Sequence, residues 1–234
     1  MDNVDRFPIL RVTREGAKDT EDMVTKELPL TIILNHRELA TLLCSPTDLE
    51  YLAIGFLASE GLIKGKDEIK KITVDDQKGV VRVETSPTDI QGVAKVESQT
   101  RISAVEIFAL VKEFQHRSQI FRATGGVHSA ALCDTKSIRL FSEDIGRHNA
   151  IDKIFGQCIL RGIPTDDHIL ITSGRISSEI LLKVAKRDIP ILISKSAPTN
   201  LGVKLANDWG VTVIGFVRGE RMNIYTNGWR VVTF

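Results

Sequence analysis

The sequence predicts an α/β protein in which a three-layer αβα sandwich with a mixed sheet follows a small α+β domain. Three observations predict this class. Three short apolar runs recur late in the chain, helical patterns separate these runs, and the first third carries hairpin patterns around one helix. A chain of 234 residues and 26.0 kDa is long enough for two modest domains, which we place at 1–100 and 101–234.

The first hundred residues predict two hairpins of β-prone residues on either side of one helix. The expected strands are residues 28–34, 37–43, 72–74 and 80–83. The first hairpin turns at Asn35-His36. The helix opens after Ser45-Pro46, carries apolar residues at three- and four-residue steps, and ends at Gly61. The polar stretch between Thr85 and Ser103 predicts the connection between the domains.

The rest of the chain alternates helical and strand-like patterns. Helices are expected at 103–121, 149–160, 177–187 and 199–209, and strands at 127–132, 138–141, 169–171, 191–193 and 211–216, with one more in 222–234. Strands joined by helices of this length run parallel and are covered on both faces. This order matches the cytidine-deaminase-like fold, so we expect its three-layer αβα sandwich.

The residues with which deaminases hold zinc are absent from this sequence. Those enzymes place their zinc ligands at two helix starts, in H-x-E and P-C-x-x-C motifs. The corresponding places here read His148-Asn149-Ala150 and Ser173-Gly174-Arg175-Ile176-Ser177. They offer one candidate ligand, whereas zinc needs three or four. We therefore predict the scaffold without a metal site.

Charge, cysteine content and hydropathy exclude several classes of protein. Lys and Arg number 31 against 30 Asp and Glu, and the net charge of +1 gives no global field that would draw nucleic acid or an anionic membrane. The three cysteines, an odd number at wide separations, favour a reducing compartment. No stretch has the apolar length of a signal peptide or a membrane span, so we expect a cytoplasmic protein.

Polar loops follow the predicted strands at one edge of the sheet. In open α/β sheets, ligands collect at the carboxyl ends of the strands, where helix N-termini present free N–H groups. Six potential cations lie in these loops: Arg147, His148, Arg175, Lys195, Arg218 and Arg221. Taken singly, the small residues of the loops are N-caps and turns, as Ser177 could be. Taken together, the cations predict a pocket for an anion.

We expect the ligand of this pocket to be phosphorylated and planar. Arginine and helix N-termini bind phosphate, and the neighbouring acids Glu143 and Asp144 suit an amidine edge such as that of guanine. The sequence has no phosphate-loop or dinucleotide-binding glycine motif, and Gly125-Gly126 predicts a tight turn. It also has no G-x-S-x-G motif, so serine hydrolase chemistry is not expected.

No residue is assigned a catalytic role. Cys158 lies on the apolar stripe of a predicted helix and Cys133 ends an apolar strand, so both are interpreted as packing residues. Cys44 precedes a helix start, where the pKa of a thiol can fall, but the inert interpretation is favoured there too. His128 is interpreted as a structural histidine with satisfied hydrogen bonds.

Five segments that span nearly the whole chain resemble the FdhD family, the formate dehydrogenase accessory sulfurtransferases. They are SPTDLEYLAIGFLASEGLI (45–63), TGGVHSAAL (124–132), EDIGRHNAIDKIFG (143–156), the long segment 173–216 with SGRISSE and SKSAPT, and FVRGERMNIYT (216–226). The combination of EDIGRHNAIDK with SGRISSE and SKSAPT is specific, so chance agreement does not account for it.

The resemblance implies a cytoplasmic homodimer that takes sulfur from a cysteine desulfurase. The sulfur passes to molybdenum bis(molybdopterin guanine dinucleotide), the cofactor cargo, before its insertion into formate dehydrogenase. The family's F-x-R-x-x-R stretch, which holds the guanine dinucleotide, would be Phe216, Val217, Arg218, Gly219, Glu220 and Arg221. With these we group Arg147, His148, Arg175 and Ser177 as predicted cofactor-binding residues, for which a guanine nucleotide can serve as a surrogate ligand.

One departure from the family pattern concerns the sulfur carrier itself. Family members that transfer sulfur carry a C-G-x-C-G loop before the first long helix of the C-terminal domain, whereas the stretch Val96 to Ser103 here reads VESQTRIS. A thiolate is needed to carry sulfane sulfur. Three hypotheses follow: a cofactor-binding scaffold without sulfurtransferase activity, a sulfurtransferase that uses Cys44 or Cys133, and a nucleotide-binding regulator unrelated to formate dehydrogenase.

Overall fold

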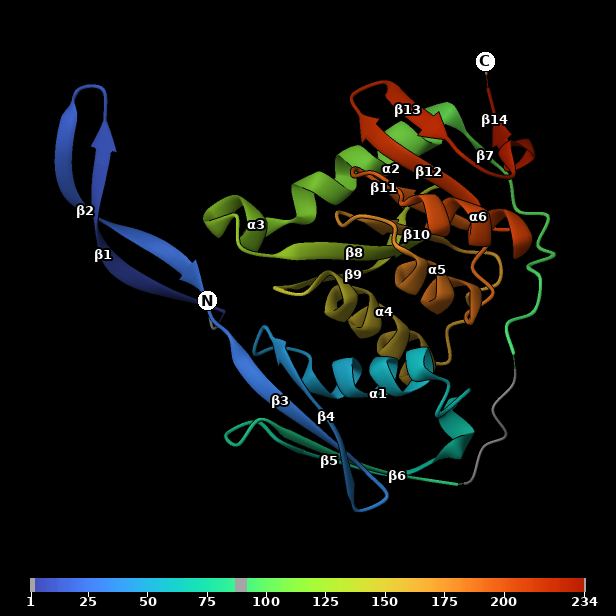
Figure 1. The fold of residues 1–234 in the computed structure, drawn as a ribbon, viewed down its shortest axis with the longest axis horizontal. Coiled ribbons are helices and arrows are strands. Elements are labelled where there is room, and N and C mark those ends of the chain that lie inside the picture. The colour runs from blue at the N-terminus through green and yellow to red at the C-terminus, as the bar shows by residue number, and fades with distance from the viewer. Residues whose placement is uncertain (1–2, 87–91, 234) are drawn as a thin grey trace.

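A two-stranded arm, a small sheet with one helix and a larger layered unit follow one another along the chain (Figure 1). The computed structural model describes residues 3–86 and 92–233. The arm consists of β1 (Val4–Thr13) and β2 (Gly16–Thr25), which pair antiparallel with each other and with no other described strand. The sequence patterns predicted no element before residue 28, so the arm is a finding of the structure.

The small unit contains the two predicted hairpins and the predicted helix. Its elements are β3 (Leu28–Leu34), β4 (Arg37–Cys44), α1 (Leu49–Glu60), the short 3₁₀ helix η1 (Lys66–Glu68), β5 (Ile69–Asp75) and β6 (Val80–Thr85). The hairpins join through a parallel β3–β6 pair into one sheet, in the order β4-β3-β6-β5. Asn35 and His36 have left-handed backbone conformations, as a tight two-residue hairpin turn requires. The apolar face of this sheet packs on α1.

The larger unit has the predicted order of helices and strands. Its elements are β7 (Ile102–Ser103), α2 (Ala104–Arg117), α3 (Gln119–Thr124), β8 (His128–Cys133), β9 (Ile138–Asp144), α4 (Arg147–Arg161), β10 (Ile169–Thr172), α5 (Ser178–Ala185), β11 (Ile191–Ser194), α6 (Asn200–Asp208), β12 (Thr212–Arg218), β13 (Arg221–Ile224), η2 (Gly228–Arg230) and β14 (Val231–Val232). The sheet order is β13-β12-β11-β10-β8-β9. Strands β10, β11 and β12 run parallel, as predicted.

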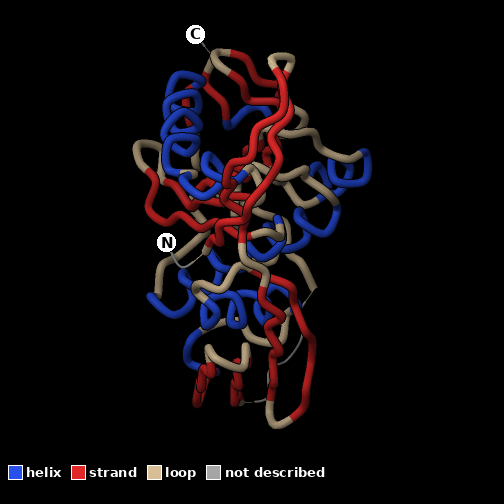
Figure 2. Tube along the Cα trace, turned by 90° about the vertical axis from the view of Figure 1, so that its left-hand side faces the viewer, coloured by secondary structure: helices blue, strands red, loops and turns tan. Residues whose placement is uncertain are grey.

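Helices cover both faces of this sheet. One face packs on α4, α5 and α6, and the other packs on α2 together with the small β7–β14 pair. Figure 2 shows helices on either side of the strands in this unit. Because both faces are covered, the central strands β10 and β11 are apolar up to their last residues, Thr172 and Ser194. The α/β class with a mixed sheet is confirmed, and the specific deaminase-like layering stays a prediction.

The predicted continuous helix 103–121 is wrong in its last four residues. A capping box of Ser103 and Glu106 starts α2, but the chain turns at Ser118 and begins the separate helix α3. The buried Ser118 hydroxyl lies within hydrogen-bond distance of the Phe114 carbonyl and of the Ser129 hydroxyl on β8. This polar bond to the sheet fixes the break between the helices. The tail contains two short strands, β13 and β14, where one was expected.

The small and large units meet where α1 crosses α4 (Figure 1). A Cβ atom on Gly156 would overlap the Tyr51 carbonyl, and one on Gly55 would overlap the Asp152 carbonyl. Only glycine allows the two helix backbones to approach so closely. Ile159 of α4 also belongs to the core of the small unit. The domain boundary near residue 100 stays a prediction, and residues 87–91 of the predicted connection lie outside the described residues.

Two buried ion pairs lie beside this crossing. The Lys153 Nζ is 2.7 Å from the Asp144 Oδ2, and both side chains are fully buried. The Lys183 Nζ is 2.6 Å from the Asp152 Oδ2, and the Ser59 hydroxyl of α1 donates to the other oxygen of that carboxylate. Within 3–86 and 92–233, every helix is too short or too polar to cross a membrane.

Candidate functional site

A cavity lies at the carboxyl edge of the large sheet, between the loops after β10 and β11 and the end of α2. It has a volume of about 490 Å³ and is lined by Phe114, Gln115, His116, Ser118, Phe121, Arg122, His128, Ser129, Ser173 and Lys195. A second hollow of about 470 Å³ shares Gln115, Ser173 and Lys195 with it and adds Ser196, Arg218 and Gly219. The two hollows are parts of one site, which we call the edge cavity.

Ser173 organises the floor of the edge cavity. Its hydroxyl oxygen accepts a hydrogen bond from the Ser129 N–H and lies 3.1 Å from the His128 Nδ1. Burial lowers the pKa of His128, and the positive charge of Arg147 lowers it further. Because both causes disfavour the charged imidazole, His128 offers the cavity a neutral ring. The position interpreted as merely structural therefore belongs to the site.

Lys195 and Arg218 form the cationic side of the edge cavity. Burial lowers the pKa of Lys195, and the nearby Arg218 guanidinium lowers it further. Within the described parts of the chain, neither cation is in an ion pair with a carboxylate. Two such cations repel each other, and an anion bound between them would relieve the repulsion.

Phe216 has a strained backbone next to Arg218. Its φ of 54° is left-handed, which is uncommon for an aromatic residue, and it lies at a register shift of β12 between Gly215 and Arg218. The Phe216 N–H donates to the Ser196 carbonyl, and the Arg218 guanidinium carbon is 5.9 Å from the centre of the Phe216 ring. Strain of this kind persists where the surrounding structure enforces it, often at binding sites.

The other members of the predicted F-x-R-x-x-R stretch differ in exposure. Val217 is fully buried in the core under α2, so it supports the strand and does not face the cavity. Gly219 lines the edge cavity, while Glu220 and Arg221 are exposed at the turn from β12 to β13. Arg221 stands opposite Arg218 in this hairpin. The stretch therefore brings Arg218 and Gly219 directly to the site.

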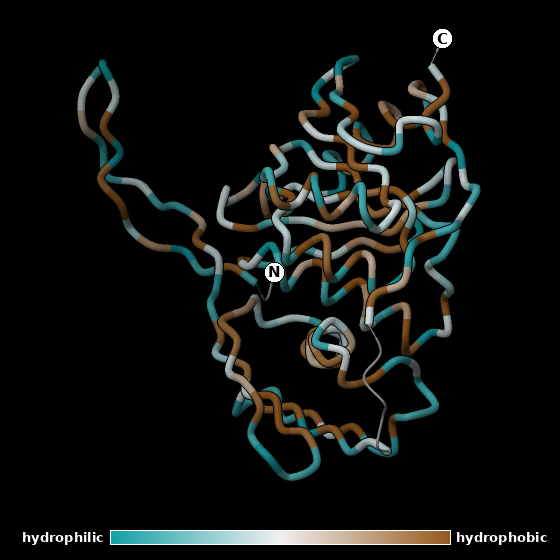
Figure 3. Tube along the Cα trace, turned by 45° about the vertical axis from the view of Figure 1, so that its right-hand side comes forward, coloured by the Kyte–Doolittle hydropathy of each residue, from teal (hydrophilic) through white to brown (hydrophobic). Residues whose placement is uncertain are grey.

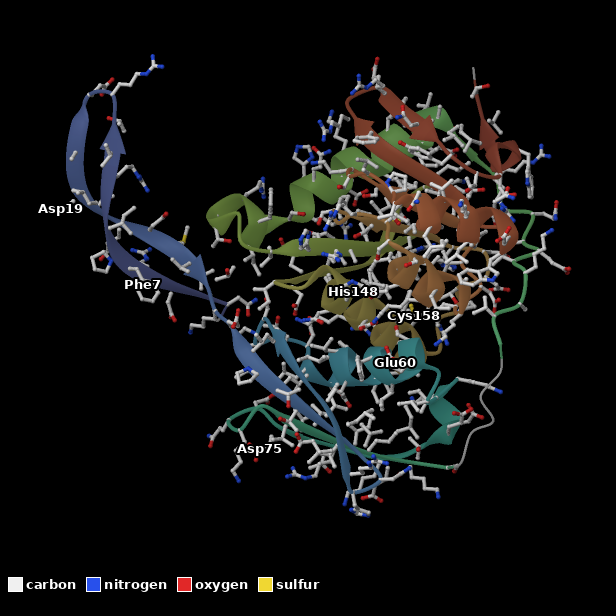
Figure 4. All side chains as sticks on the ribbon, viewed as in Figure 1. Phe7, Asp19, Glu60, Asp75, His148 and Cys158 are labelled. Carbon is white, nitrogen blue, oxygen red and sulfur yellow. The ribbon has the colours of Figure 1, made fainter. Side chains whose placement is uncertain are left out.

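Of the two cations at the start of α4, Arg147 lies near His128 without lining the edge cavity, and His148 faces another cavity. A Cβ on Gly174 would lie 2.9 Å from the Arg147 Cβ, so Gly174 lets this side chain pack against the loop after β10. The Arg147 Nε is buried without a hydrogen-bond partner among the described residues. His148 lies between α4 and α5 (Figure 4), with its Nε2 3.4 Å from the Glu179 Oε2, and lines a separate cavity of about 400 Å³.

Arg175 and Ser177 lie beside the edge cavity without lining it. Arg175 is exposed to solvent. Ser177 is the N-cap of α5, and its hydroxyl accepts from the Ile180 N–H at 3.4 Å. The capping interpretation of Ser177 is thus confirmed. Whether either residue touches a ligand stays a prediction.

The expectation that Glu143 and Asp144 face a guanine edge is wrong. The Glu143 carboxylate accepts the Ile120 and Phe121 N–H groups at the start of α3. The Asp144 carboxylate is fully buried and accepts from the Ser45 and Gly146 N–H groups and from the Asn149 amide, besides its ion pair with Lys153. Both acids bind backbone N–H groups of the protein, and neither lines the edge cavity.

Sequence reasoning missed the wall that α2 and α3 contribute to the edge cavity. Phe121, which is 49% exposed, supplies aromatic surface there, and Gln115, His116 and Arg122 supply polar groups, while Phe114 is buried beneath them. One signal could have indicated it: the polar run Gln115-His116-Arg117-Ser118 interrupts an apolar stripe. A run of this kind marks a helix end, and helix ends beside strand ends commonly line sites.

All three cysteines lie away from the edge cavity and are buried. Burial raises the pKa of Cys44 to about 12, with a further contribution from Asp144, and raises the pKa of Cys158 to about 11. Burial also raises the pKa of Cys133. A raised pKa keeps each group as a thiol near neutral pH, and the thiol is a poor nucleophile.

We therefore expect the native protein to resist thiol modification. At pH 8, iodoacetamide should leave Cys44, Cys133 and Cys158 intact, while all three should react in concentrated guanidinium chloride, as intact-mass spectrometry can show. Rapid modification of any of them in the native state would contradict their burial. The denatured sample is the control for reagent quality.

Comparisons with known proteins find one family along nearly the whole chain. The model of the FdhD/NarQ family matches residues 25–94 and 87–232. The chain belongs to the FdhD/NarQ family. Among its FdhD relatives, the sulfur carrier protein FdhD of Bacillus pumilus is 42% identical over 257 positions that cover 98% of each chain. That of Bacillus subtilis is 43% identical, covering 90% of this chain and 91% of the relative.

A solved structure resembles this FdhD/NarQ chain throughout. The crystal structure described as a formate dehydrogenase accessory protein of Desulfotalea psychrophila has a TM-score of 0.89 and 31% sequence identity, and it covers 98% of this chain and 100% of its own. The alignment with the Bacillus pumilus relative runs over 257 positions, more than the 234 residues here. That relative therefore contains residues for which this chain has no counterpart. The two family-model matches meet at 87–94, just before the stretch where the resemblance places the cysteine loop.

The stretch from Val96 to Ser103 is tied to the body at the far end of α2. The Val96 N–H donates to the Trp209 carbonyl, and the Arg230 guanidinium donates to the Ser98 carbonyl. The edge cavity lies at the other end of α2, about 20 Å away for a helix of 14 residues. The segment that replaces the family's loop thus lies one helix length from the cavity.

Proposed function

We propose that the protein is a formate dehydrogenase accessory protein that binds molybdenum bis(molybdopterin guanine dinucleotide) in the edge cavity and assists its sulfuration. The observation that carries this proposal is the placement of Lys195 and Arg218 in one site with the exposed aromatic ring of Phe121. Cationic side chains bind phosphate groups, and an aromatic side chain packs against a flat heterocycle. The names of the relatives and of the similar crystal structure support the same function.

Each part of the edge cavity would serve one part of the ligand. Lys195 and Arg218 would hold the phosphates. Phe121 would pack against the ring of the ligand, with His128 as a neutral hydrogen-bonding group. Arg147, whose Nε lacks a partner, would complete the positive surroundings from behind Gly174.

The buried cysteines favour the scaffold form of this function. With no accessible thiol among the three, we propose that this chain would hold the cofactor while a cysteine desulfurase supplies the sulfur, without a persulfide on the chain itself. The partners would then be the desulfurase, formate dehydrogenase and a second copy of this protein in a cytoplasmic homodimer. Incubation with a desulfurase and cysteine should add no sulfur mass to any of the three cysteines.

Replacing Arg218 by alanine should weaken the binding of GDP, the surrogate ligand. A hydrogen bond to a charged group contributes about 1.5–3 kcal/mol, so the Kd measured by isothermal titration calorimetry should rise at least about tenfold. The additional substitution Arg221→Ala should weaken binding less, because Arg218 lines the edge cavity and Arg221 does not.

Arg37→Ala is the matched control, because Arg37 is exposed on β4 in the small unit. Its Kd should equal that of the wild type. Wild-type protein that does not bind GDP, or an Arg218→Ala variant that binds as well as the wild type, contradicts the proposed site. Tight GDP binding without binding of the complete cofactor would indicate a nucleotide-binding regulator instead.

A further inference from the structure

The arm formed by β1 and β2 exposes apolar side chains that nothing in the described chain covers. Phe7 is 51% exposed, Leu10 62%, Val12 72% and Val24 45%. Leu10 and Val12 lie on one face of the ribbon, and Phe7 lies on the opposite face because successive side chains alternate. Figure 4 shows Phe7 on the arm, away from both units. An isolated two-stranded hairpin is marginally stable in water, so this ribbon needs a covering surface.

The solvent-accessible surface of the chain indicates how much area a partner could bury. The chain exposes 12191 Å², whereas a compact monomer of this mass exposes about 10,500 Å². The excess of roughly 1,700 Å² is close to the total area buried in a standard protein–protein interface, about 1,600 Å². With strands of 10 residues, the arm is about 30 Å long, which exceeds the radius of gyration of about 17 Å for a globule of this length.

The charges of the arm indicate what covers it. The arm carries four basic and five acidic residues, with three of the basic ones in its first half and four of the acidic ones in its second half: Arg6, Arg11, Arg14 and Lys18 against Asp5, Glu15, Asp19, Glu21 and Asp22. Two cross-strand ion pairs, Arg6–Glu21 and Arg11–Asp22, already balance part of this charge within the ribbon. Figure 3 shows hydrophilic and hydrophobic segments alternating along the arm. A surface of this kind meets a copy of itself without net repulsion, which an isologous twofold interface requires.

We propose that the arm packs against a second copy of this chain and is the main interface of a homodimer. The inference rests on the dimer put forward in the proposed function and names the surface that forms it. Leu10 and Val12 are the anchors, because they are the most exposed apolar residues of the arm. Each copy gives its arm to the other, so the contact is made twice about the twofold axis.

Sedimentation equilibrium of the full chain tests this interface. The wild type should have twice the chain mass of 26.0 kDa at micromolar concentration. The double variant Leu10→Asp with Val12→Asp should raise the dimer dissociation constant at least about tenfold, because two carboxylates would be buried without partners. Leu201→Asp on α6 is the matched control, since Leu201 is 49% exposed on the body, and it should remain dimeric.

Each result distinguishes the interface from the proposed ligand site. A monomeric wild type overturns the dimer and the arm interface together, while GDP titration still reports on the edge cavity. A double variant that stays as dimeric as the wild type, with far-UV circular dichroism unchanged, overturns the arm interface alone. Dissociation by Leu201→Asp but not by the arm variant moves the interface to the body. Loss of the dimer in the arm variant alone supports the arm interface, whether or not the protein binds GDP.

Discussion

Replacing Gly156 by leucine should lower the free energy of unfolding by more than about 4 kcal/mol, enough to unfold a marginally stable protein. Any Cβ at this position would overlap the Tyr51 carbonyl of α1. Leucine forms helices better than glycine by somewhat less than about 1 kcal/mol, so helix propensity opposes the loss only weakly. Helices α1 and α4 would have to separate, which opens the core that Leu52, Ile54 and Ile159 share. Urea unfolding followed by circular dichroism measures the change.

Gly92→Leu is the control for this prediction. A Cβ on Gly92 would meet no atom within 4 Å, and its backbone conformation is not left-handed. Its free energy of unfolding should stay within about 0.5 kcal/mol of the wild type. If Gly156→Leu were equally mild, the two helices would not be in backbone contact, and the connection between the small and large units would need another explanation.

The order of elements in the large unit could be predicted because burial on both faces leaves a clear pattern. The runs at 169–171 and 191–193 are apolar throughout, and a parallel strand between two helical layers permits little else. The helix break at Ser118 could not be predicted in the same way. Ser118 bonds to Ser129 on β8, beyond the helix α3. The helix propensities of the residues around Ser118 carry no signal for such a tertiary contact.

The arm could not be predicted because it has no buried face. Its strands mix charged and apolar residues on both faces, and Pro8 interrupts a pattern that would otherwise favour a strand. A strand with one buried face alternates cleanly between apolar and polar residues, and the arm lacks this alternation. The missing signal is itself informative, because it agrees with a ribbon whose covering surface lies outside the chain.

The general place of the candidate site could be predicted, but the direction of its side chains could not. The topology of parallel strands brings Ser173, Lys195 and Arg218 to one edge, as expected. Arg147 and His148 are neighbours at a helix start, yet one approaches the edge cavity and the other faces the cavity beside α5. Successive helical residues point about 100° apart. Spacing in sequence therefore places both residues near the loop without showing which of them faces the ligand.

Replacing Lys153 by methionine should lower the free energy of unfolding by about 3–5 kcal/mol, because the buried Asp144 carboxylate would lose its charged partner. Lys153 and Asp144 are both fully buried with 2.7 Å between their charged atoms, so neither charge can reach water when its partner is removed. The Asp144 carboxylate would keep three hydrogen-bond donors but lose its only opposite charge among the described ion pairs. Urea unfolding at neutral pH measures the loss, and Lys204→Met on the exposed face of α6 should change stability by less than about 0.5 kcal/mol.

The double variant Asp144→Asn with Lys153→Met separates the cost of a lone charge from the value of the pair. It removes both charges and keeps most of the volume, so its loss should be well below the sum of the two single losses. Additive losses would show that the two groups stabilise the fold independently, contrary to their contact.

Asp144 also binds the Ser45 N–H before α1 and the Gly146 N–H before Arg147. Because one carboxylate fixes both the small unit and the loop of Arg147, Lys153→Met should loosen that loop and weaken GDP binding, whereas the double variant should restore part of the affinity.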